Sequence, residues 1–379
     1  MPSLPSVSPI ALFSAAAVNG PLGLGAVLQQ ALDTHWYVLG PQVQGFEEAF
    51  AAYVGVPHAV GVANGTDALE LALRAAGVQR GDRVLTVANA GFYSSTALHA
   101  IGAVPVYVDV DEASLTLSPA ALAQALAAPG PKPVAVVVTH LYGQLADMPA
   151  LLPLCRAAGL VVIEDCAQAH GAEQAGRQAG AWGDLACFSF YPTKNLGALG
   201  DGGAVLTASP DRAERLRALR QYGWSHKYTV AVPGGGNSRL DALQAAVLHA
   251  KLPHLAAHNA ARRATAARYN AAFAGLPLRC PPSVGADFVA HLYVLRTARR
   301  EALRGFLQAR GIATEVHYPL ADHQQPAYPG ACLAGGLPVT EAACATALTL
   351  PCYPGLPAAD VERVVVAVQD FFAQEPPAC

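Results

Sequence analysis

Short apolar runs rich in β-branched residues recur along the first part of the chain, separated by segments rich in alanine and leucine. Several runs are continuously apolar rather than alternating, which is typical of parallel strands buried on both faces. The predicted strands span 84–87, 104–108, 134–139, 160–164, 186–191 and 204–207. The intervening segments, such as 67–76 and 119–127, are predicted helices. This alternation of strands and helices predicts a layered α/β domain with a mostly parallel sheet.

The pattern changes after about residue 240, where two long helices are expected at 241–252 and 254–274. Two prolines then interrupt the chain, and shorter elements follow. They are strands at 288–297 and 313–318 and helices at 300–308 and 358–373. We therefore expect a large α/β domain over residues 1–250, including the N-terminal segment, and a smaller α+β domain over 251–379.

Composition excludes several classes of protein. With 53% hydrophobic and 13% charged residues the chain is not a disordered one, and a net charge of −3 without a basic run argues against a nucleic-acid partner. No apolar run reaches the roughly 18 residues of a membrane span. The cysteines show no zinc spacing, so buried reduced thiols such as Cys166 and Cys187 in a cytoplasmic protein are expected. His249, His254 and His258 are read as part of a solvated or interface helix, and no metal site is predicted.

Two residues near predicted strand ends suggest a chemistry. Asp165 ends the strand before it, and Lys194 lies in a glycine-rich loop after another strand, in a chain with only four lysines. In open α/β sheets ligands bind at the carboxyl ends of strands. A lysine that condenses with a carbonyl and an aspartate that pairs with a ring nitrogen are the partners of pyridoxal phosphate. The alternative is a helix-capping aspartate and a solvated loop lysine.

A second segment is compatible with a phosphate group. Residues 62–70 read as a turn followed by a helix start, in which Thr66 or Asp67 can cap the helix and Gly65 permits close approach of a ligand. Helix N-termini bind phosphate through free amides and the helix dipole. Ser189 adds a hydroxyl near the strand end that precedes Lys194. An ordinary helix cap is the alternative interpretation.

Several motifs together resemble the DegT/StrS family of nucleotide-sugar aminotransferases. The resemblance covers nearly the whole chain, and its motifs occur in the family's order. They lie at 35–40, 65–69, 140–144, 165–172, 188–197, 237–246 and 316–319. The combination is more specific than any one of these motifs.

The resemblance implies the type I fold of PLP-dependent transferases, similar to aspartate aminotransferase, and a homodimer with shared active sites. By motif position, Lys194 is the catalytic Schiff-base lysine, Asp165 pairs with the pyridine nitrogen, and Gln168 lies near the phenolic oxygen of pyridoxal 5′-phosphate. The residues implied to hold the phosphate are Gly65, Thr66, Ser189 and, from the neighbouring subunit, Asn237. The residues implied to bind substrate are Trp36, His317, Tyr318 and His323.

The chain departs from the family pattern at three places. Asn64 stands where the family usually has serine, and Thr193 where glycine is common. The aromatic residue that stacks on the cofactor ring is either Phe92 or Tyr93, of which we favour Tyr93. These departures leave the charged and covalent groups in place.

The resemblance also implies the reaction. One branch of the family replaces the lysine with histidine and dehydrates sugars, whereas this chain keeps Lys194. We therefore expect ping-pong transfer of an amino group from glutamate to a nucleotide-linked keto-sugar in amino-sugar or polysaccharide biosynthesis. The motifs favour a 3-keto-6-deoxy sugar over a 4-keto sugar. The alternatives are a PLP-dependent dehydratase or lyase, and a non-catalytic regulator that keeps the cofactor pocket.

Overall fold

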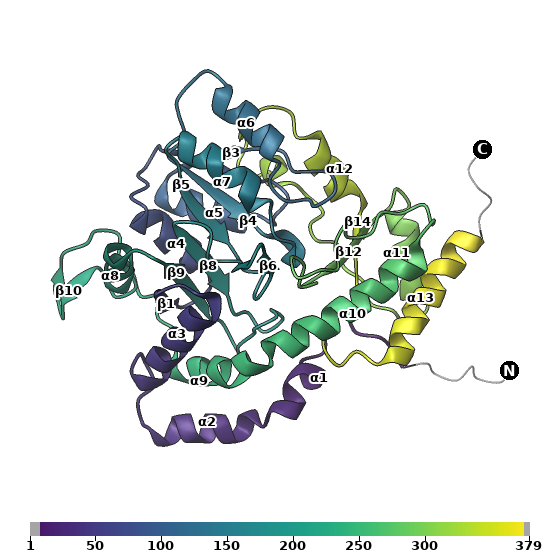
Figure 1. Ribbon diagram of the computed structural model, residues 1–379, viewed down its shortest axis with the longest axis horizontal. Coiled ribbons are helices and arrows are strands. Elements are labelled where there is room, and N and C mark those ends of the chain that lie inside the picture. Colours follow the sequence, from purple (N-terminus) through teal and green to yellow (C-terminus); the bar gives the residue numbers. More distant parts are fainter. Residues whose placement is uncertain (1–7, 375–379) are drawn as a thin grey trace.

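The computed structural model describes residues 8–374 and is built around one eight-stranded sheet (Figure 1). Seven strands are parallel, and β9 alone runs antiparallel to both of its neighbours. In spatial order the strands are β1 (His58–Val62), β9 (Gly203–Thr207), β8 (Leu185–Ser189), β5 (Val161–Asp165), β4 (Ala135–Thr139), β2 (Arg83–Thr86), β3 (Val104–Tyr107) and β13 (Cys332–Leu333). The predicted mostly parallel sheet is confirmed.

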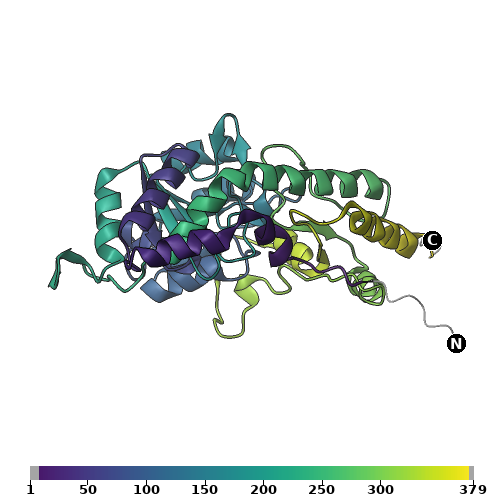
Figure 2. The same cartoon turned by 90° about the horizontal axis from the view of Figure 1, so that it is seen from below.

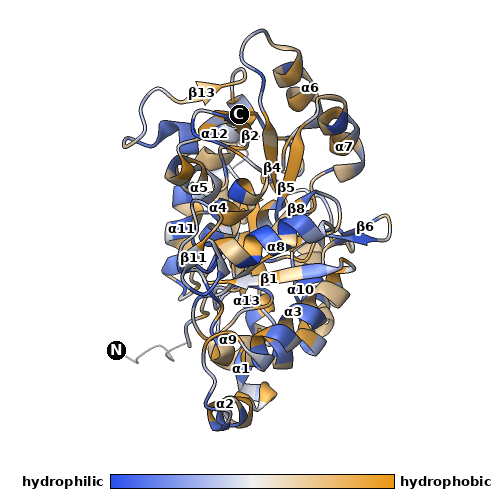
Figure 3. Ribbon diagram, turned by 90° about the vertical axis from the view of Figure 1, so that its left-hand side faces the viewer, coloured by the Kyte–Doolittle hydropathy of each residue, from blue (hydrophilic) through white to orange (hydrophobic). Residues whose placement is uncertain are grey.

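Helices cover both faces of this sheet. They are α3 (Pro41–Val54), α4 (Gly65–Ala75), α5 (Tyr93–Ile101), α6 (Pro119–Ala127), α7 (Met148–Ala157), α8 (Pro210–Leu219) and α9 (Ala242–Lys251). Because successive strand residues point to opposite faces, Val136 packs into the core under α3, α6 and α7, whereas Val137 packs into the core under α4, α5 and α8. Figure 3 shows the hydrophobic strands in the middle of these layers. Burial on both faces explains the continuous apolar runs of the sequence.

The C-terminal part forms a smaller α+β layer around its own core. Its elements are α10 (Leu255–Phe273), β12 (Tyr293–Arg296), α11 (Arg300–Gln308), α12 (Pro338–Thr346), β14 (Ala347–Leu350) and α13 (Ala358–Ala373). Figure 2 shows α10 extending from the large layer into the small one. The N-terminal segment also joins the small layer, because Ile10 pairs with Ile312.

The strand predictions for the C-terminal part were partly wrong. The strand predicted at 288–297 is confined to β12, and residues 313–318 contain only an isolated bridge from Glu315 to Thr349. The partner of β12 is β14, which the sequence pattern did not reveal. The segment carrying β13 returns to the edge of the large sheet and pairs with β3. These pairings join residues far apart in sequence, so local patterns carry little information about them.

The remaining elements are short. The N-terminal helices are α1 (Ala15–Asn19) and α2 (Leu24–Asp33), and the single 3₁₀ turns are η1 (Gly20–Leu22), η2 (Leu141–Gly143), η3 (Leu252–His254) and η4 (Asp322–Gln324). Two small hairpins are β6 (Glu173–Gln174) with β7 (Arg177–Gln178), and β10 (Trp224–His226) with β11 (Thr229–Val230). Within residues 8–374, no helix is both long and apolar enough to cross a membrane.

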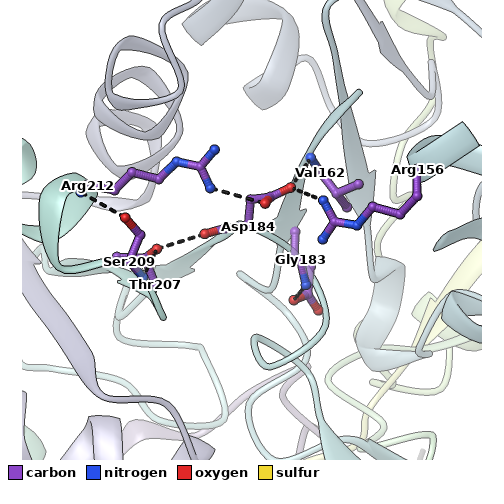
Figure 4. Close-up of polar contacts among 8 residues, drawn as sticks. Arg156, Val162, Gly183, Asp184, Thr207, Ser209 and Arg212 are labelled. Carbon is purple, nitrogen blue, oxygen red and sulfur yellow. Dashed lines mark hydrogen bonds and ion pairs between the residues drawn. The ribbon is translucent and has the colours of Figure 1, made fainter. Parts of the chain in front are cut away.

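Asp184 ties several elements together where β5 and β8 begin (Figure 4). Its carboxylate accepts hydrogen bonds from the Val162 N–H at 2.9 Å and from Arg156 at 2.8 Å, and it pairs with Arg212 at 3.1 Å. Its backbone carbonyl accepts the Thr207 hydroxyl at 2.8 Å. Burial would raise the pKa of this carboxyl, but the Val162 N–H and the two guanidinium groups hold it below its usual value.

We expect Asp184→Ala to lower the free energy of unfolding by about 2 kcal/mol, because it removes several charge-assisted hydrogen bonds at once. The stabilisation is present above the ordinary pKa of 3.8 and is lost as the pH falls through the lower pKa of the folded state. Urea unfolding as a function of pH measures both effects. Asp360→Ala, which breaks a half-buried i,i+3 pair with Arg363, is the control and should cost about 0.5 kcal/mol or less. Equal losses in the two variants would contradict the assignment.

Candidate active site

A cavity of about 640 Å³ lies at the carboxyl ends of β4, β5 and β8, against the N-terminus of α4. This is the edge of the sheet where parallel α/β folds bind ligands. Nine of the residues that the sequence motifs select line it, namely Gly65, Thr66, Tyr93, Asp165, Gln168, Ser189, Lys194, His317 and Tyr318. Motifs separated by more than 200 residues in sequence thus line the same cavity.

Asp165 is the last residue of β5, and its side chain is buried in the cavity wall. Oδ1 accepts the Ala167 N–H at 3.1 Å, and Oδ2 accepts the Thr139 hydroxyl at 3.4 Å. Burial raises the pKa of this carboxyl, and these hydrogen bonds together with nearby Lys194 only partly offset it. A desolvated carboxylate that faces a cavity is suited to pair with a cationic group of a ligand.

Lys194 follows β8 in a tight turn in which its backbone N–H donates to the Tyr191 carbonyl at 2.8 Å. Its amine lines the cavity and donates to no other residue in the 8–374 range. Burial lowers the pKa of the amine to about 8, although the charge of Asp165 acts in the opposite direction. About a tenth of the amine is therefore neutral and nucleophilic at pH 7, far more than for an ordinary lysine.

The start of α4 forms an anion cradle. The first amides of a helix have no intrahelical partner, and here those of Gly65 and Thr66 lie at the cavity wall. A Cβ at Gly65 would lie 2.6 Å from the Ser189 Cβ, so only glycine permits this approach of the helix to the end of β8. The predicted cap was wrong. Asn64 caps the helix by accepting the Asp67 N–H at 2.8 Å, because its side chain immediately precedes the first turn.

Tyr93 and Phe92 lie on opposite sides of the start of α5. Tyr93 lines the cavity, and its ring lies edge-on to that of Tyr318 at 6.2 Å. Phe92 has a positive φ of 70° and packs instead against Tyr328, with ring centroids 5.0 Å apart. Of these two residues, Tyr93 is therefore the one that a planar ligand in this cavity would contact.

Asp322 anchors the start of α5 and was not found from the sequence. Its buried carboxyl accepts the Phe92 N–H at 2.9 Å and the Ser95 hydroxyl at 2.6 Å. Because Ser95 donates there, the Tyr107 hydroxyl donates to Ser95 at 2.9 Å. Asp322 thereby positions Tyr93, and no local pattern marks it, because it lies 230 residues from Phe92 in sequence.

The Asp322 anchor predicts a pH dependence. Burial raises the pKa of this carboxyl from 3.8 to about 7, so its contribution to stability is complete below 3.8 and is lost as the pH rises to about 7. We expect the melting temperature of the wild type, relative to that of Asp322→Asn, to fall across this interval. Thermal unfolding of both proteins over the interval measures the difference. Parallel curves would show that the pKa of this carboxyl is not raised in the folded protein.

Part of the cavity wall is a hydrogen-bonded set from four segments. Gln168 Oε1 accepts the Tyr142 N–H at 2.6 Å, and its amide group donates to the Tyr318 hydroxyl at 3.1 Å. The Tyr142 hydroxyl donates to the carbonyl of His317, whose ring is hydrogen-bonded to Thr349 at 2.8 Å. This network holds Gln168, Tyr318 and His317 against the cavity.

Three other residues selected from the sequence lie outside the cavity of this chain. Trp36 is 57% exposed, with its indole N–H donating to the Val38 carbonyl. Asn237 is exposed beyond the β10–β11 hairpin. His323 is hydrogen-bonded to Glu341 at 3.0 Å.

A buried cluster of His140, Glu164 and Cys166 behind Asp165 has the composition of a metal site. Its polar atoms are already used. His140 Nδ1 accepts the Ala146 N–H, so its Nε2–H donates to Glu164, whose oxygens also accept the N–H groups of Gly180, Trp182 and Gly183. The cluster is therefore a structural support for the strand that ends in Asp165.

The cavity fits pyridoxal phosphate by the chemistry of its walls. An unpartnered lysine amine, a desolvated carboxylate and an aromatic ring suit the aldehyde, the ring nitrogen and the ring face respectively. The Gly65 cradle with Ser189 suits the phosphate.

Comparisons with known proteins agree with this geometry. Residues 25–369 match the model of the DegT/DnrJ/EryC1/StrS aminotransferase family. The chain is 46% identical over 349 residues, 91% of each chain, to a dTDP-3-amino-3,4,6-trideoxy-α-D-glucose transaminase from Streptomyces venezuelae. It is 40% identical over 348 residues, 92% of each, to a UDP-N-acetyl-3-dehydro-α-D-glucosamine 3-aminotransferase from Acidithiobacillus ferrooxidans. A crystal structure of S. venezuelae DesV with a ketimine intermediate is 44% identical, with a TM-score of 0.93 over 98% of this chain and 100% of that one.

Proposed function

The chain belongs to the DegT/DnrJ/EryC1/StrS aminotransferase family and is thus a PLP-dependent nucleotide-sugar aminotransferase. We propose that it transfers the amino group of glutamate to carbon 3 of a dTDP-linked 3-keto-6-deoxy sugar. The family, fold class and cofactor expected from the sequence motifs are confirmed. Carbon 3 is the position named for both relatives above, although their nucleotides differ. The observation that supports catalysis most directly is the meeting of Lys194 and Asp165 in one cavity.

The proposed division of roles follows from position. Pyridoxal phosphate, when bound, supplies an aldehyde carbon that exchanges amino groups and a ring that accepts electrons from the α-carbon of the donor. Gly65, Thr66 and Ser189 bind the phosphate through amides and a hydroxyl. Asp165 holds the proton on the ring nitrogen, because ionisation of this buried carboxyl becomes favourable beside a cation.

Lys194 carries the proton in this proposal. With a pKa of about 8, its amine has a neutral fraction that can take the proton from the α-carbon of the donor and deliver it to the cofactor carbon. With the cofactor bound, Tyr93 would contact the ring face, and Gln168, which is fixed by Tyr142 and Tyr318, would hydrogen-bond its phenolic oxygen. Asp165 and Gln168 are buried, which limits the access of water to the reacting atoms from their side of the cavity.

We also propose a homodimer in which each chain completes the cavity of its partner. The β10–β11 hairpin projects away from the body of the chain (Figures 1 and 2) and exposes Tyr228 by 77% and Val230 by 64%. Exposed apolar groups of this size are typical of interaction surfaces. Asn237 follows this hairpin and is exposed, as expected for a residue that reaches the phosphate of the partner's site.

A complementation experiment tests this arrangement. We expect Lys194→Ala and Asn237→Ala to be impaired alone but to regain about a quarter of wild-type activity when mixed at equal amounts after reversible dissociation, because half of the dimers then hold one intact site. Recovery is measured as 2-oxoglutarate formed per protein. If Asn237 acted within its own chain, every mixed dimer would lack an intact site and no activity would return.

The reaction itself is tested with a panel of nucleotide-linked 3-keto and 4-keto sugars and glutamate, followed by mass spectrometry of the product and assay of 2-oxoglutarate. We expect amination of the dTDP-linked 3-keto sugar with one 2-oxoglutarate per turn. A product that loses water without forming 2-oxoglutarate would indicate the dehydratase or lyase alternative. Absence of turnover with every sugar would favour the regulator.

We further propose a cytoplasmic location. The free cysteines support it, namely Cys155, Cys166, Cys187, Cys280, Cys332, Cys344 and Cys352.

A further inference from the structure

A second, smaller cavity of about 110 Å³ adjoins the one that holds Lys194. The two share four wall residues, Thr193, His291, Leu292 and His317, which lie between them. At about 30 Å³ per water, the smaller cavity has room for roughly three or four waters. That space also accommodates a carboxylate group with an adjoining methylene.

Arg262 lines the smaller cavity and is an unusual cation. It extends from α10, is 2% exposed, and donates through Nη1 to the carbonyls of Ala290, His291 and Cys352. Its Nε and Nη2 atoms donate to no residue within 8–374, and no carboxylate in that range pairs with it. Burial lowers the pKa of the guanidinium to about 10, so it remains charged at neutral pH. A buried, uncompensated charge is costly, which makes an anion the complementary ligand.

The other described walls of this cavity are compatible with an organic anion. None of them is an aspartate or glutamate, and Thr193 and Thr349 add hydroxyl groups. His291 is neutral, because burial holds its pKa well below the usual value, and its Nδ1–H donates to Asn195 at 3.0 Å. Leu12, Phe13 and Leu350 provide an apolar side for a hydrocarbon segment.

The main cavity lacks such a cation. Its described walls contain Asp165 and Asp201 but no arginine, and its lysine is the reacting group. An amino-acid donor nevertheless brings a carboxylate on the carbon that reacts beside Lys194, and glutamate brings a second one. Arg262 lies across the shared wall formed by Thr193, the neighbour of Lys194 in sequence.

We propose that the Arg262 cavity is the subsite for a carboxylate of the amino donor, with Arg262 supplying the charge and Thr193 and Thr349 the flanking hydroxyls. This inference rests on the proposed use of glutamate. It gives the enzyme a physical basis for preferring an acidic donor, since the unused Nη2 donor of Arg262 can hydrogen-bond a carboxylate in this cavity. For a donor to reach both cavities, the shared wall of Thr193, His291, Leu292 and His317 has to open.

Binding of glutarate, an unreactive dicarboxylate, to the holoenzyme tests the proposal by calorimetry. We expect Arg262→Gln to raise the Kd for glutarate about tenfold or more, and Arg262→Lys to raise it less. The matched control is Arg263→Gln, the next arginine on the same helix, which lines neither cavity and should bind as the wild type does. In steady-state assays the KM for glutamate should rise in Arg262→Gln while the KM for the keto-sugar stays unchanged.

The same experiment can overturn the proposal. If Arg262→Gln and Arg263→Gln bind glutarate with the same Kd, Arg262 has only a structural role, as a donor to the three backbone carbonyls. If Arg262→Gln does not fold, Thr193→Val and Thr349→Val decide, because both keep the side-chain volume, and unchanged binding in both rejects the subsite. Failure of the proposed function is distinguishable, since the wild type would then form no 2-oxoglutarate from glutamate at all.

Discussion

Replacing Lys194 with alanine should abolish amino transfer, with a loss of at least about a thousandfold in turnover. The amine is the nucleophile and the proton carrier in the proposed mechanism, and the other lysines lie outside the described cavity walls. The fold should survive. Since burial lowers the pKa of Lys194 to about 8, its charged form is disfavoured in the folded protein, and removing it does not reduce stability near neutral pH.

Lys194→Arg should be equally inactive, because a guanidinium keeps the charge but does not lose its proton to act as a nucleophile or base. Lys132→Ala is the control, as Lys132 is exposed and its amine donates only to the Leu126 carbonyl. Turnover, thermal unfolding and borohydride trapping with peptide mapping are the measurements. Trapping on another lysine, or near-normal turnover in either Lys194 variant, would reject the assigned role.

Asp165→Asn should lower turnover by about a hundredfold or more while leaving the protein folded. Asparagine keeps the shape of the side chain and can still accept the Ala167 N–H, but it lacks the charge that holds a proton on a ring nitrogen. Because burial raises the pKa of the carboxyl, its ionised form does not stabilise the fold, so a neutral side chain is tolerated.

The neighbouring Glu164→Gln variant is a matched control, since Glu164 lies in the same strand but binds His140 and three backbone amides. Here we expect the opposite result, a lower free energy of unfolding with turnover per folded molecule retained. Kinetics and urea unfolding of both variants provide the comparison. Loss of stability in Asp165→Asn with normal turnover would reverse the two roles and contradict the proposal.

Much of the candidate site could be read from local sequence, because each part depends on a short segment. Asp165 closes an apolar strand, Lys194 sits in a glycine-rich loop, and Gly65 opens a helix. Strand ends of a parallel sheet meet at one edge, so these residues were expected to lie together. The sequence favoured Tyr93 over Phe92, and the structure shows how the two differ, since the positive φ of Phe92 turns consecutive side chains to opposite sides.

Residues whose partners lie far away in sequence were not predicted from the sequence. Asp322 reaches the start of α5 from 230 positions away, and Arg262 reaches its cavity from the middle of a long helix that reads only as polar and small. Neither residue belongs to a motif with a characteristic spacing. Their burial and their partners exist only once the small layer packs on the large one.

The amino-acid order alone therefore determined the alternation of strands and helices, the family and the lysine proposed to react, because these depend on periodicity and on contiguous motifs. The tertiary structure decided what depends on packing between remote segments. It brought β14 beside β12, directed Tyr93 rather than Phe92 into the cavity, and left Arg262 buried without a counter-charge among the described residues. The physical reason is that a local pattern records which face of an element is buried, whereas the neighbour on that face is selected only when the whole chain is compact.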